Sequence, residues 1–255
     1  MNPFSEKKAK NIRKKSLGQC FLEDRNILQL EAKLAGVTGK TVLEIGPGDG
    51  RLTSFLLKEH PKKIIVVEID PKFVAILREK FGNKIEIIEG DFLEIDLPDV
   101  DIVIGNIPYY ISSDIIFRLA KLKIEKALLM VQKEFAQKMA AKPGESNYGR
   151  LSITSQLAFK LQLERVVLRH LFRPIPRVDS AIINLVPTGL GLTQFQENII
   201  RWLFQHKNKT VRNALLDSKM FTKEELEKLG SFLKLRPANL SKENCLEIAQ
   251  ILKSS

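Results

Sequence analysis

The segment Asn-Ile-Pro-Tyr at 106–109 brings together three groups that suit recognition of a planar base. The side-chain oxygen of Asn106 and the carbonyl oxygen of Pro108 are hydrogen-bond acceptors, and the ring of Tyr109 can stack on a base. Two acceptors can take both hydrogens of an exocyclic amine. The segment follows an apolar run at 100–105, so we expect it at the end of a strand. A tight turn without a ligand is the alternative interpretation.

A glycine-rich segment lies earlier in the chain, at 42–50. Its apolar residues run into Gly46, Gly48 and Gly50, as in a strand followed by a loop that cradles a nucleotide-like cofactor. Glycine lets the backbone approach a ligand closely and adopt positive φ angles. A dinucleotide fingerprint would have glycine at position 51, where this chain has Arg51, so NAD is a less favoured ligand.

Two carboxylates end the next two expected strands. Glu68 lies about twenty residues past the glycines, where an acid can accept both hydroxyls of a ribose. Asp91 could accept a hydrogen bond from an adenine amine, with Phe92 beside the ring. Each could also be an ordinary acid at a turn. Because three consecutive strand ends each fit one part of an adenosine, we favour a binding site over coincidence.

The elements that must position these residues alternate in type from about 22 to 186. Short β-branched runs alternate with amphipathic segments, which is typical of a parallel α/β sheet. We expect strands at 41–45, 63–69, 85–88, 101–104 and 127–131, and helices at 26–35, 52–57, 71–81 and 113–122. The strands would bring the candidate residues to one edge of the sheet.

The pattern changes in the last third of the chain. Strand-like runs at 161–168 and 180–186 flank a segment in which two prolines bar a regular helix. We expect a hairpin-like pair with a stiff, exposed, basic connection. The remaining pattern is helical, at 194–206, 209–216, 223–229 and 242–252. The sequence therefore predicts an α/β domain at 1–187, with a basic N-terminal segment, and a helical RNA-binding domain at 188–255.

The charge balance narrows the class of partner. Forty-one basic and 30 acidic residues give a net charge of +11 over 255 residues, which favours association with polyanions. Nucleic acid is preferred over an anionic membrane, because no apolar run approaches the length of a spanning helix. A lysine-rich solvated surface is the alternative interpretation.

Cysteine and histidine usage gives no sign of a metal centre. Cys20 and Cys245 form no metal or redox spacing, and the three histidines are too scattered to share an ion. Basic residues near the N-terminus lack a following apolar region, which argues against secretion. We expect a reduced, cytoplasmic setting and no metal.

Several segments together resemble the S-adenosylmethionine-dependent rRNA adenine dimethyltransferases, in particular the small-subunit, kasugamycin-resistance type. They are 15–22, 44–50, 67–70, 90–91, 105–109, 148–151 and 172–180. The similarity spans nearly the whole chain in the right order. Asn-x-Pro-Tyr combined with Phe-x-Pro-x-Pro-x-Val-Asp-Ser is a specific pair. The resemblance implies a Rossmann-like class I methyltransferase domain of α/β class, followed by a small all-helical domain.

The same resemblance implies an activity and partners. The reaction would be dimethylation of the exocyclic amines of two adjacent adenosines, in a hairpin loop near the 3′ end of 16S rRNA. The cofactor would be S-adenosyl-L-methionine. The partner would be small-subunit rRNA within the 30S particle or its precursor, in small-subunit ribosome biogenesis. We expect a monomer that binds no membrane.

The resemblance also assigns site residues. The implied catalytic residues are Asn106, Pro108, Tyr109 and, on the other side of a flipped base, Phe172. The implied cofactor contacts are Cys20, Leu22, Gly46, Gly48, Glu68, Asp91 and Asn106. Since the family usually has Asn or His in place of Cys20, we expect backbone contacts there. The expected RNA contacts are Lys14, Lys15, Arg173, Arg177, Lys207, Lys209 and Arg212.

The mechanism follows from what these motifs lack. They contain no His or Lys placed as an obvious base. An adenine amine is a poor nucleophile because its lone pair is delocalised into the ring. Accepting both N–H bonds on Asn106 and Pro108 would favour a pyramidal nitrogen whose lone pair can meet the methyl group. Catalysis would then be mostly orientation and electrostatics, with stacking offsetting the cost of flipping the base.

Two alternatives stay open. The chain also resembles the large-subunit (23S) rRNA methyltransferases of the macrolide-resistance type around 106–116. A different class is a non-catalytic ribosome-assembly or transcription factor that binds RNA on the same scaffold. The complete set of Gly46, Gly48, Glu68, Asp91 and Asn106 argues against that class.

Overall fold

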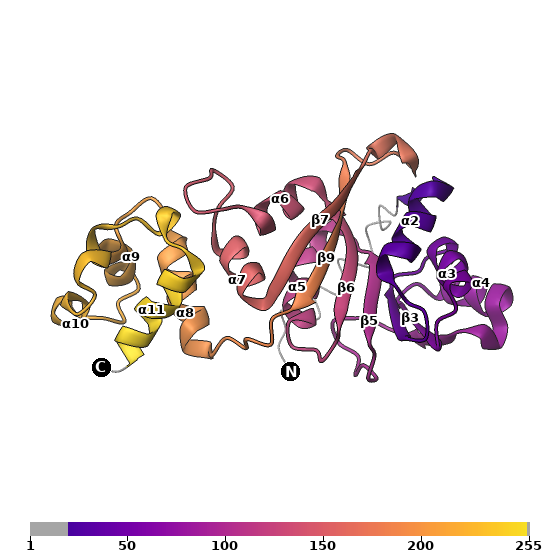
Figure 1. Cartoon of the computed structure of the whole chain (residues 1–255), viewed down its shortest axis with the longest axis horizontal. Helices are drawn as coiled ribbons and strands as arrows, with labels where there is room; N and C mark the ends of the chain where they lie inside the picture. Colours follow the sequence, from indigo (N-terminus) through magenta and orange to yellow (C-terminus); the bar gives the residue numbers. More distant parts are fainter. Residues whose placement is uncertain (1–19, 254–255) are drawn as a thin grey trace.

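The centre of the protein is a mixed seven-stranded sheet with helices on both faces (Figure 1). The structure is a computed structural model that describes residues 20–253. The strands are β2 (Thr41–Ile45), β3 (Lys63–Glu68), β4 (Glu86–Glu89), β5 (Ile102–Asn106), β6 (Lys126–Gln132), β7 (Phe159–Val167) and β9 (Ser180–Pro187). Their order across the sheet is β4-β3-β2-β5-β6-β9-β7.

The strand directions confirm most of the predicted sheet. The run from β4 to β6 is parallel, as the alternation of strands and helices predicts. β9 is antiparallel to both of its neighbours, β6 and β7, which confirms the hairpin-like pair. Two further short strands pair outside this sheet: β1 (Phe21–Leu22) is antiparallel to β8 (Phe172–Arg173). The α/β class is therefore confirmed, with an antiparallel edge.

Helices cover both faces because the strands are apolar on both sides. One core cluster contains Val42 and Ile64 beneath α2 (Arg25–Ala35), α3 (Arg51–Leu56) and α4 (Pro71–Phe81). Their chain neighbours Leu43 and Ile65 belong to a second cluster, beneath α5 (Ser112–Leu119) and α6 (Lys133–Ala140). Alternate residues thus face opposite layers, as strands buried on both faces require.

Local signals fix the helix ends close to the site. Asp24 caps α2 by accepting the N–H of Ile27 at 2.9 Å, and Gly36 ends the helix with a left-handed φ of 60°. Asp70 caps α4, and Pro71 occupies the first turn, where its missing N–H costs nothing. Both helices pack on the sheet face that carries Val42 and Ile64.

The C-terminal helices gather at one end of the molecule (Figure 1). They are α8 (Gln194–Gln205), α9 (Val211–Asp217), α10 (Lys223–Glu227) and α11 (Lys242–Lys253). Their core cluster also takes in Tyr148, Ile153 and Leu157, the last two on α7 (Arg150–Ala158). The Tyr148 hydroxyl donates to the Leu240 carbonyl at 2.6 Å. The division into domains at 187/188 stays a prediction.

Short 3-10 helices complete the chain, at Leu57–Glu59, Gly82–Lys84, Tyr109–Ile111, Arg169–Leu171, Gly230–Lys234 and Pro237–Asn239. One of them follows β5 directly and carries Tyr109. The helices α6 and α7 were not predicted, and neither was the pairing of β1 with β8.

Candidate active site

The candidate residues converge where the order of the strands reverses. The chain passes from β2 to β3 and β4 on one side, and then returns to place β5 and β6 on the other. Glu44 on β2 pairs with Ile104 on β5, so the ends of these strands are neighbours. A Cβ on Gly105 would lie 2.7 Å from the Ile45 carbonyl oxygen, so only glycine allows this approach. Open parallel sheets bind ligands at this switch point.

The glycine loop opens directly from β2. Gly46 and Gly48 have φ angles of 62° and 57°, in the left-handed region that favours glycine. A Cβ on Gly46 would meet nothing within 4 Å, whereas one on Gly48 would lie 2.8 Å from the Phe21 ring. Gly46 is exposed, so the loop has a packed side and an open side. The open side leaves its backbone accessible to a ligand.

Glu68, at the end of β3, organises this loop. Only 2% of the residue is exposed, and burial raises the pKa of its carboxyl. One carboxylate oxygen accepts the Gly48 N–H at 3.1 Å, and the other accepts the N–H groups of Ile69 and Asp70, each at 2.9 Å. A carboxylate has about four acceptor positions. A ribose that used both oxygens would therefore compete with at least one of these bonds.

Asn106 is the last residue of β5, and the two ends of its side-chain amide have different surroundings. Its Nδ2 donates to Glu31 Oε2 at 3.4 Å. Its Oδ1 is buried and has no hydrogen-bond partner within residues 20–253. Buried acceptors without a partner are uncommon and costly. The atom that the sequence assigns to an amine is thus an acceptor without a donor.

Pro108 and Tyr109 follow in the turn after β5. The Pro108 carbonyl accepts the Ile111 N–H at 3.2 Å and the Ser112 hydroxyl at 3.4 Å. An amine at this carbonyl would replace the weaker hydroxyl contact. The Tyr109 hydroxyl lies 2.8 Å from Ser180 Oγ. Tyr109 is half-buried, and desolvation is the main cause that raises its pKa.

Phe172 lies on β8 and is packed into the first core cluster, with 3% of the residue exposed. Stacking on a flipped base would require its ring to become more accessible. The segment that follows is only partly the exposed connection that the sequence predicts. Arg173 and Arg177 are exposed, but Pro176 is buried.

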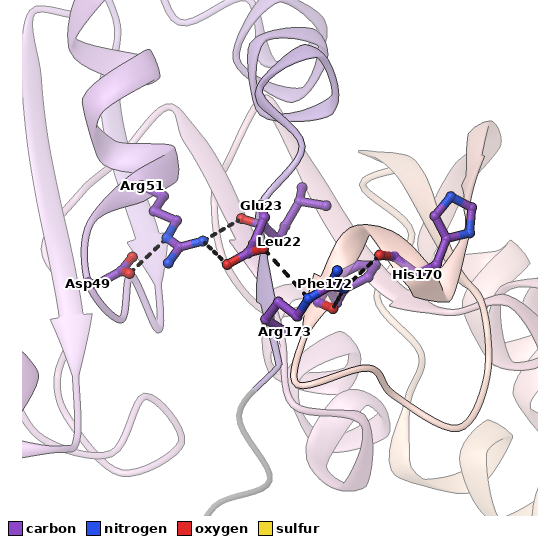
Figure 2. Close-up of polar contacts among 7 residues, drawn as sticks. All are labelled: Leu22, Glu23, Asp49, Arg51, His170, Phe172 and Arg173. Atoms are coloured by element: carbon purple, nitrogen blue, oxygen red, sulfur yellow. Dashed lines mark hydrogen bonds and ion pairs between the residues drawn. The ribbon is translucent and has the colours of Figure 1, made fainter.

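Charged side chains join this segment to the glycine loop, as Figure 2 shows. Arg51, the first residue of α3, donates to Asp49 at 2.8 Å and lies 3.5 Å from both the Leu22 carbonyl and Glu23. Glu23 in turn lies 3.9 Å from Arg173, whose guanidinium also donates to the carbonyls of His170 and Phe172. Arg51, which stands where a dinucleotide fingerprint has glycine, therefore links the glycine loop to β1 and, through Glu23, to β8.

The remaining expected cofactor contacts border the same region. Leu22 is buried on β1, and Cys20 packs against the first core cluster, where burial raises the pKa of its thiol. Cys20 is also close enough to Tyr109 to raise that hydroxyl's pKa. Asp91 accepts the Leu93 N–H at 2.9 Å through Oδ1, which fixes the turn after β4.

The expected RNA-binding residues have varied environments. Lys207 donates to the carbonyls of Ser146 and Tyr148, at 2.8 and 3.0 Å. Lys209 pairs with Asp217 at 2.6 Å, and Arg212 pairs with Glu227. A phosphate at these three cations would compete with contacts inside the chain. Lys14 and Lys15 lie outside the described residues.

Sequence reasoning missed two partners of the site, Glu31 and Ser180. Glu31 had a recognisable signal, because it falls on the buried stripe of α2 with Leu28, Ala32 and Ala35. A carboxyl group is rarely buried on an apolar helix face unless it is paired.

Across residues 20–253, no cluster of three or more His, Cys, Asp or Glu side chains could hold a metal ion. No helix in that range is long and apolar enough to cross a bilayer.

Comparison with known proteins gives consistent matches. The family model described as "Ribosomal RNA adenine dimethylase" matches residues 10–254. A probable ribosomal RNA small subunit methyltransferase A from Methanopyrus kandleri is 41% identical, over 95% of this chain and 93% of that protein. The crystal structure of a dimethyladenosine transferase from Plasmodium falciparum has a TM-score of 0.82 and 31% identity, over 92% of this chain and 98% of that one. The 23S rRNA methyltransferase ErmE has a TM-score of 0.69 and 29% identity, over 91% and 99%.

Proposed function

The chain belongs to the ribosomal RNA adenine dimethylase family, and we propose that its site at the β2–β5 switch point holds the cofactor beside an extruded adenine. The protein is an S-adenosylmethionine-dependent methyltransferase that dimethylates adenine in small-subunit rRNA. The finer target is our proposal: two adjacent adenosines in a hairpin loop near the 3′ end of 16S rRNA. We also propose that the enzyme acts as a cytoplasmic monomer on the 30S particle or its precursor.

The residues present fit the cofactor. Gly46 leaves the loop open on one side, and Glu68 and Asp91 supply carboxylates at the next two strand ends. When bound, S-adenosylmethionine supplies a methyl group on a positively charged sulfur. Glu68 would hold the ribose, Asp91 the adenine amine, and the backbone at Cys20, Leu22, Gly46 and Gly48 would line the remainder. The residues therefore match a nucleoside better than a metal ion or a bare phosphate.

The observation that carries the proposal is the buried Oδ1 of Asn106, which has no donor within the described chain. A target amine would provide that donor once the turn after β5 moved enough to expose the oxygen. With its second hydrogen on the Pro108 carbonyl, the amine nitrogen would become pyramidal and direct its lone pair towards the methyl group. Asn106 and Pro108 would contribute orientation, and Tyr109 and Phe172 would stack on the base.

The basic residues complete the proposal. Arg173 and Arg177 are exposed, and we propose that they contact phosphates around an extruded base, Arg173 after exchange of its contacts to Glu23 and two carbonyls. Lys207, Lys209 and Arg212 would provide a second contact on the C-terminal helices, after exchange of their present partners. Lys14 and Lys15 would extend the basic surface.

Competition between the two ribosomal subunits tests the substrate assignment. Labelled S-adenosylmethionine is supplied together with small and large subunits that lack adenine dimethylation, and each RNA is then isolated. We expect the label in the small-subunit RNA. Label confined to the large-subunit RNA would favour the macrolide-resistance type of activity, and binding without transfer would favour a non-catalytic assembly factor.

A further inference from the structure

Glu31 occupies a position where an apolar side chain would be expected. It lies on the buried stripe of α2 with Leu28, Ala32 and Ala35, and only 1% of the residue is exposed. Burying a carboxyl without a partner is costly, because its hydrogen bonds to water are lost. Within residues 20–253, this carboxyl accepts a hydrogen bond from Asn106 Nδ2 at 3.4 Å. Burial raises its pKa to about 8, with the Glu44 carboxyl as a smaller contribution.

The two ends of the Asn106 side-chain amide therefore differ in their hydrogen bonding. Glu31 accepts a hydrogen bond from the Nδ2 end, while the Oδ1 end is buried without a donor. With Glu31 ionised, rotating the amide by half a turn would place two acceptor oxygens against each other. It would also present an NH₂ group to the incoming amine, which would repel it. The partner at Nδ2 thus decides whether Asn106 offers an acceptor or a donor.

We propose that Glu31 is a positioning residue that holds the Asn106 carboxamide with its oxygen towards the target amine. The proposal rests on the role given above to Asn106. A protonated carboxyl keeps an acceptor oxygen but gains a donor, so the ionised form of Glu31 is the one that fixes the amide orientation. Glu31 lies on α2 with only 1% of the residue exposed, so it acts through Asn106.

A pair of substitutions separates this role from packing. Glu31→Leu keeps much of the volume and removes the acceptor, whereas Glu31→Gln keeps an acceptor oxygen. We expect Glu31→Leu to lower kcat for methyl transfer about tenfold, as loss of one orienting hydrogen bond allows. The KM for S-adenosylmethionine should change less than kcat, because Gly46, Gly48, Glu68 and Asp91 are untouched. Glu31→Gln should restore most of kcat. Thermal unfolding of each variant establishes that it is folded.

The Asn106→Ala background provides the decisive comparison. If Glu31 acts through Asn106, adding Glu31→Leu to Asn106→Ala should cause no further loss of kcat, so the two effects are not additive. Three results would overturn the proposal: parental kcat in Glu31→Leu, equal losses in Glu31→Leu and Glu31→Gln, or additive losses in the double variant. Parental activity in Asn106→Ala would instead overturn the role of Asn106 itself, so the two failures are distinguishable.

Discussion

The Tyr109 hydroxyl lies 2.8 Å from the Ser180 hydroxyl, which joins the turn after β5 to the first residue of β9. Ser180 is fully buried. The two motifs that make the sequence resemblance specific, at 106–109 and 172–180, therefore meet through their last residues. The bond orients the half-buried Tyr109 ring.

This contact gives a prediction for Tyr109. Tyr109→Phe removes the hydroxyl bond but keeps the ring, so we expect stability to fall by about 1 kcal/mol and turnover to fall only a few-fold. Tyr109→Ala also removes the stacking surface, which is worth about 1–3 kcal/mol per base, so kcat/KM for rRNA should fall at least tenfold further. Steady-state methyl transfer measures both. Equal activity of the two variants would contradict a stacking role for the ring.

Glu68 should control cofactor affinity. Glu68→Gln leaves one acceptor oxygen where the carboxylate now receives three N–H groups, so the Gly48 loop and any ribose contact are both weakened. We expect S-adenosylmethionine affinity to fall about tenfold or more by calorimetry, with the fold retained. Glu89→Gln is the matched control, because Glu89 pairs with Glu68 in the sheet register but is exposed. Unchanged affinity in Glu68→Gln would refute the assignment.

The buried acids should make stability depend on pH. The pKa of Glu31 is raised from 4.5 to about 8, and that of Glu44 to about 7, chiefly by burial. At a pH between the carboxyl pKa of the unfolded chain and that of the folded chain, the folded chain still holds protons that the unfolded chain has released. The free energy of unfolding should therefore fall as pH rises from about 5 to 8.

Urea unfolding at pH 5.5 and 8.5 checks this prediction. The difference between the two pH values should be smaller for Glu31→Gln than for the parent, since other titrating groups are common to both chains. An identical difference would mean that Glu31 takes up no extra proton on folding.

The fold could be predicted where each strand carries its own signal. The strands from 41–45 to 127–131 were placed to within about two residues because they are short β-branched runs between turn residues. Helix α7 was missed because its polar and apolar residues do not separate onto two faces: Ser152, Thr154 and Ser155 are buried together with Ile153. Periodicity cannot reveal a helix whose faces do not differ in polarity.

The sequence likewise predicts some site residues and misses others. Glu68, Asp91 and Asn106 could be proposed from the sequence because parallel strands bring their carboxyl ends to one edge. The contact between Glu31 and Asn106 could not, since it depends on how α2 lies across the sheet. The burial of Phe172 likewise depends on the pairing of β8 with β1, two-residue strands that carry no periodic signal.

The exposed arginines should carry part of the RNA affinity. Each phosphate contact contributes about 0.9 to the slope of log affinity against log salt, so Arg173→Gln with Arg177→Gln should flatten that slope by about two. Lys62→Gln with Lys84→Gln is the matched control, because both lysines are exposed near the amino ends of β3 and β4, away from the site. If both double variants gave the parental slope, the arginines would be ordinary solvated charges.

The most direct test of the account is to map the modified nucleosides made by the parent and by Asn106→Ala. Small subunits lacking the modification are incubated with S-adenosylmethionine, and the rRNA is digested and analysed by mass spectrometry. We expect the parent to produce N6,N6-dimethyladenosine at two adjacent positions near the 3′ end. Asn106→Ala, folded and supplied with saturating S-adenosylmethionine, should produce little or none. The same products at a similar rate from Asn106→Ala would contradict the account.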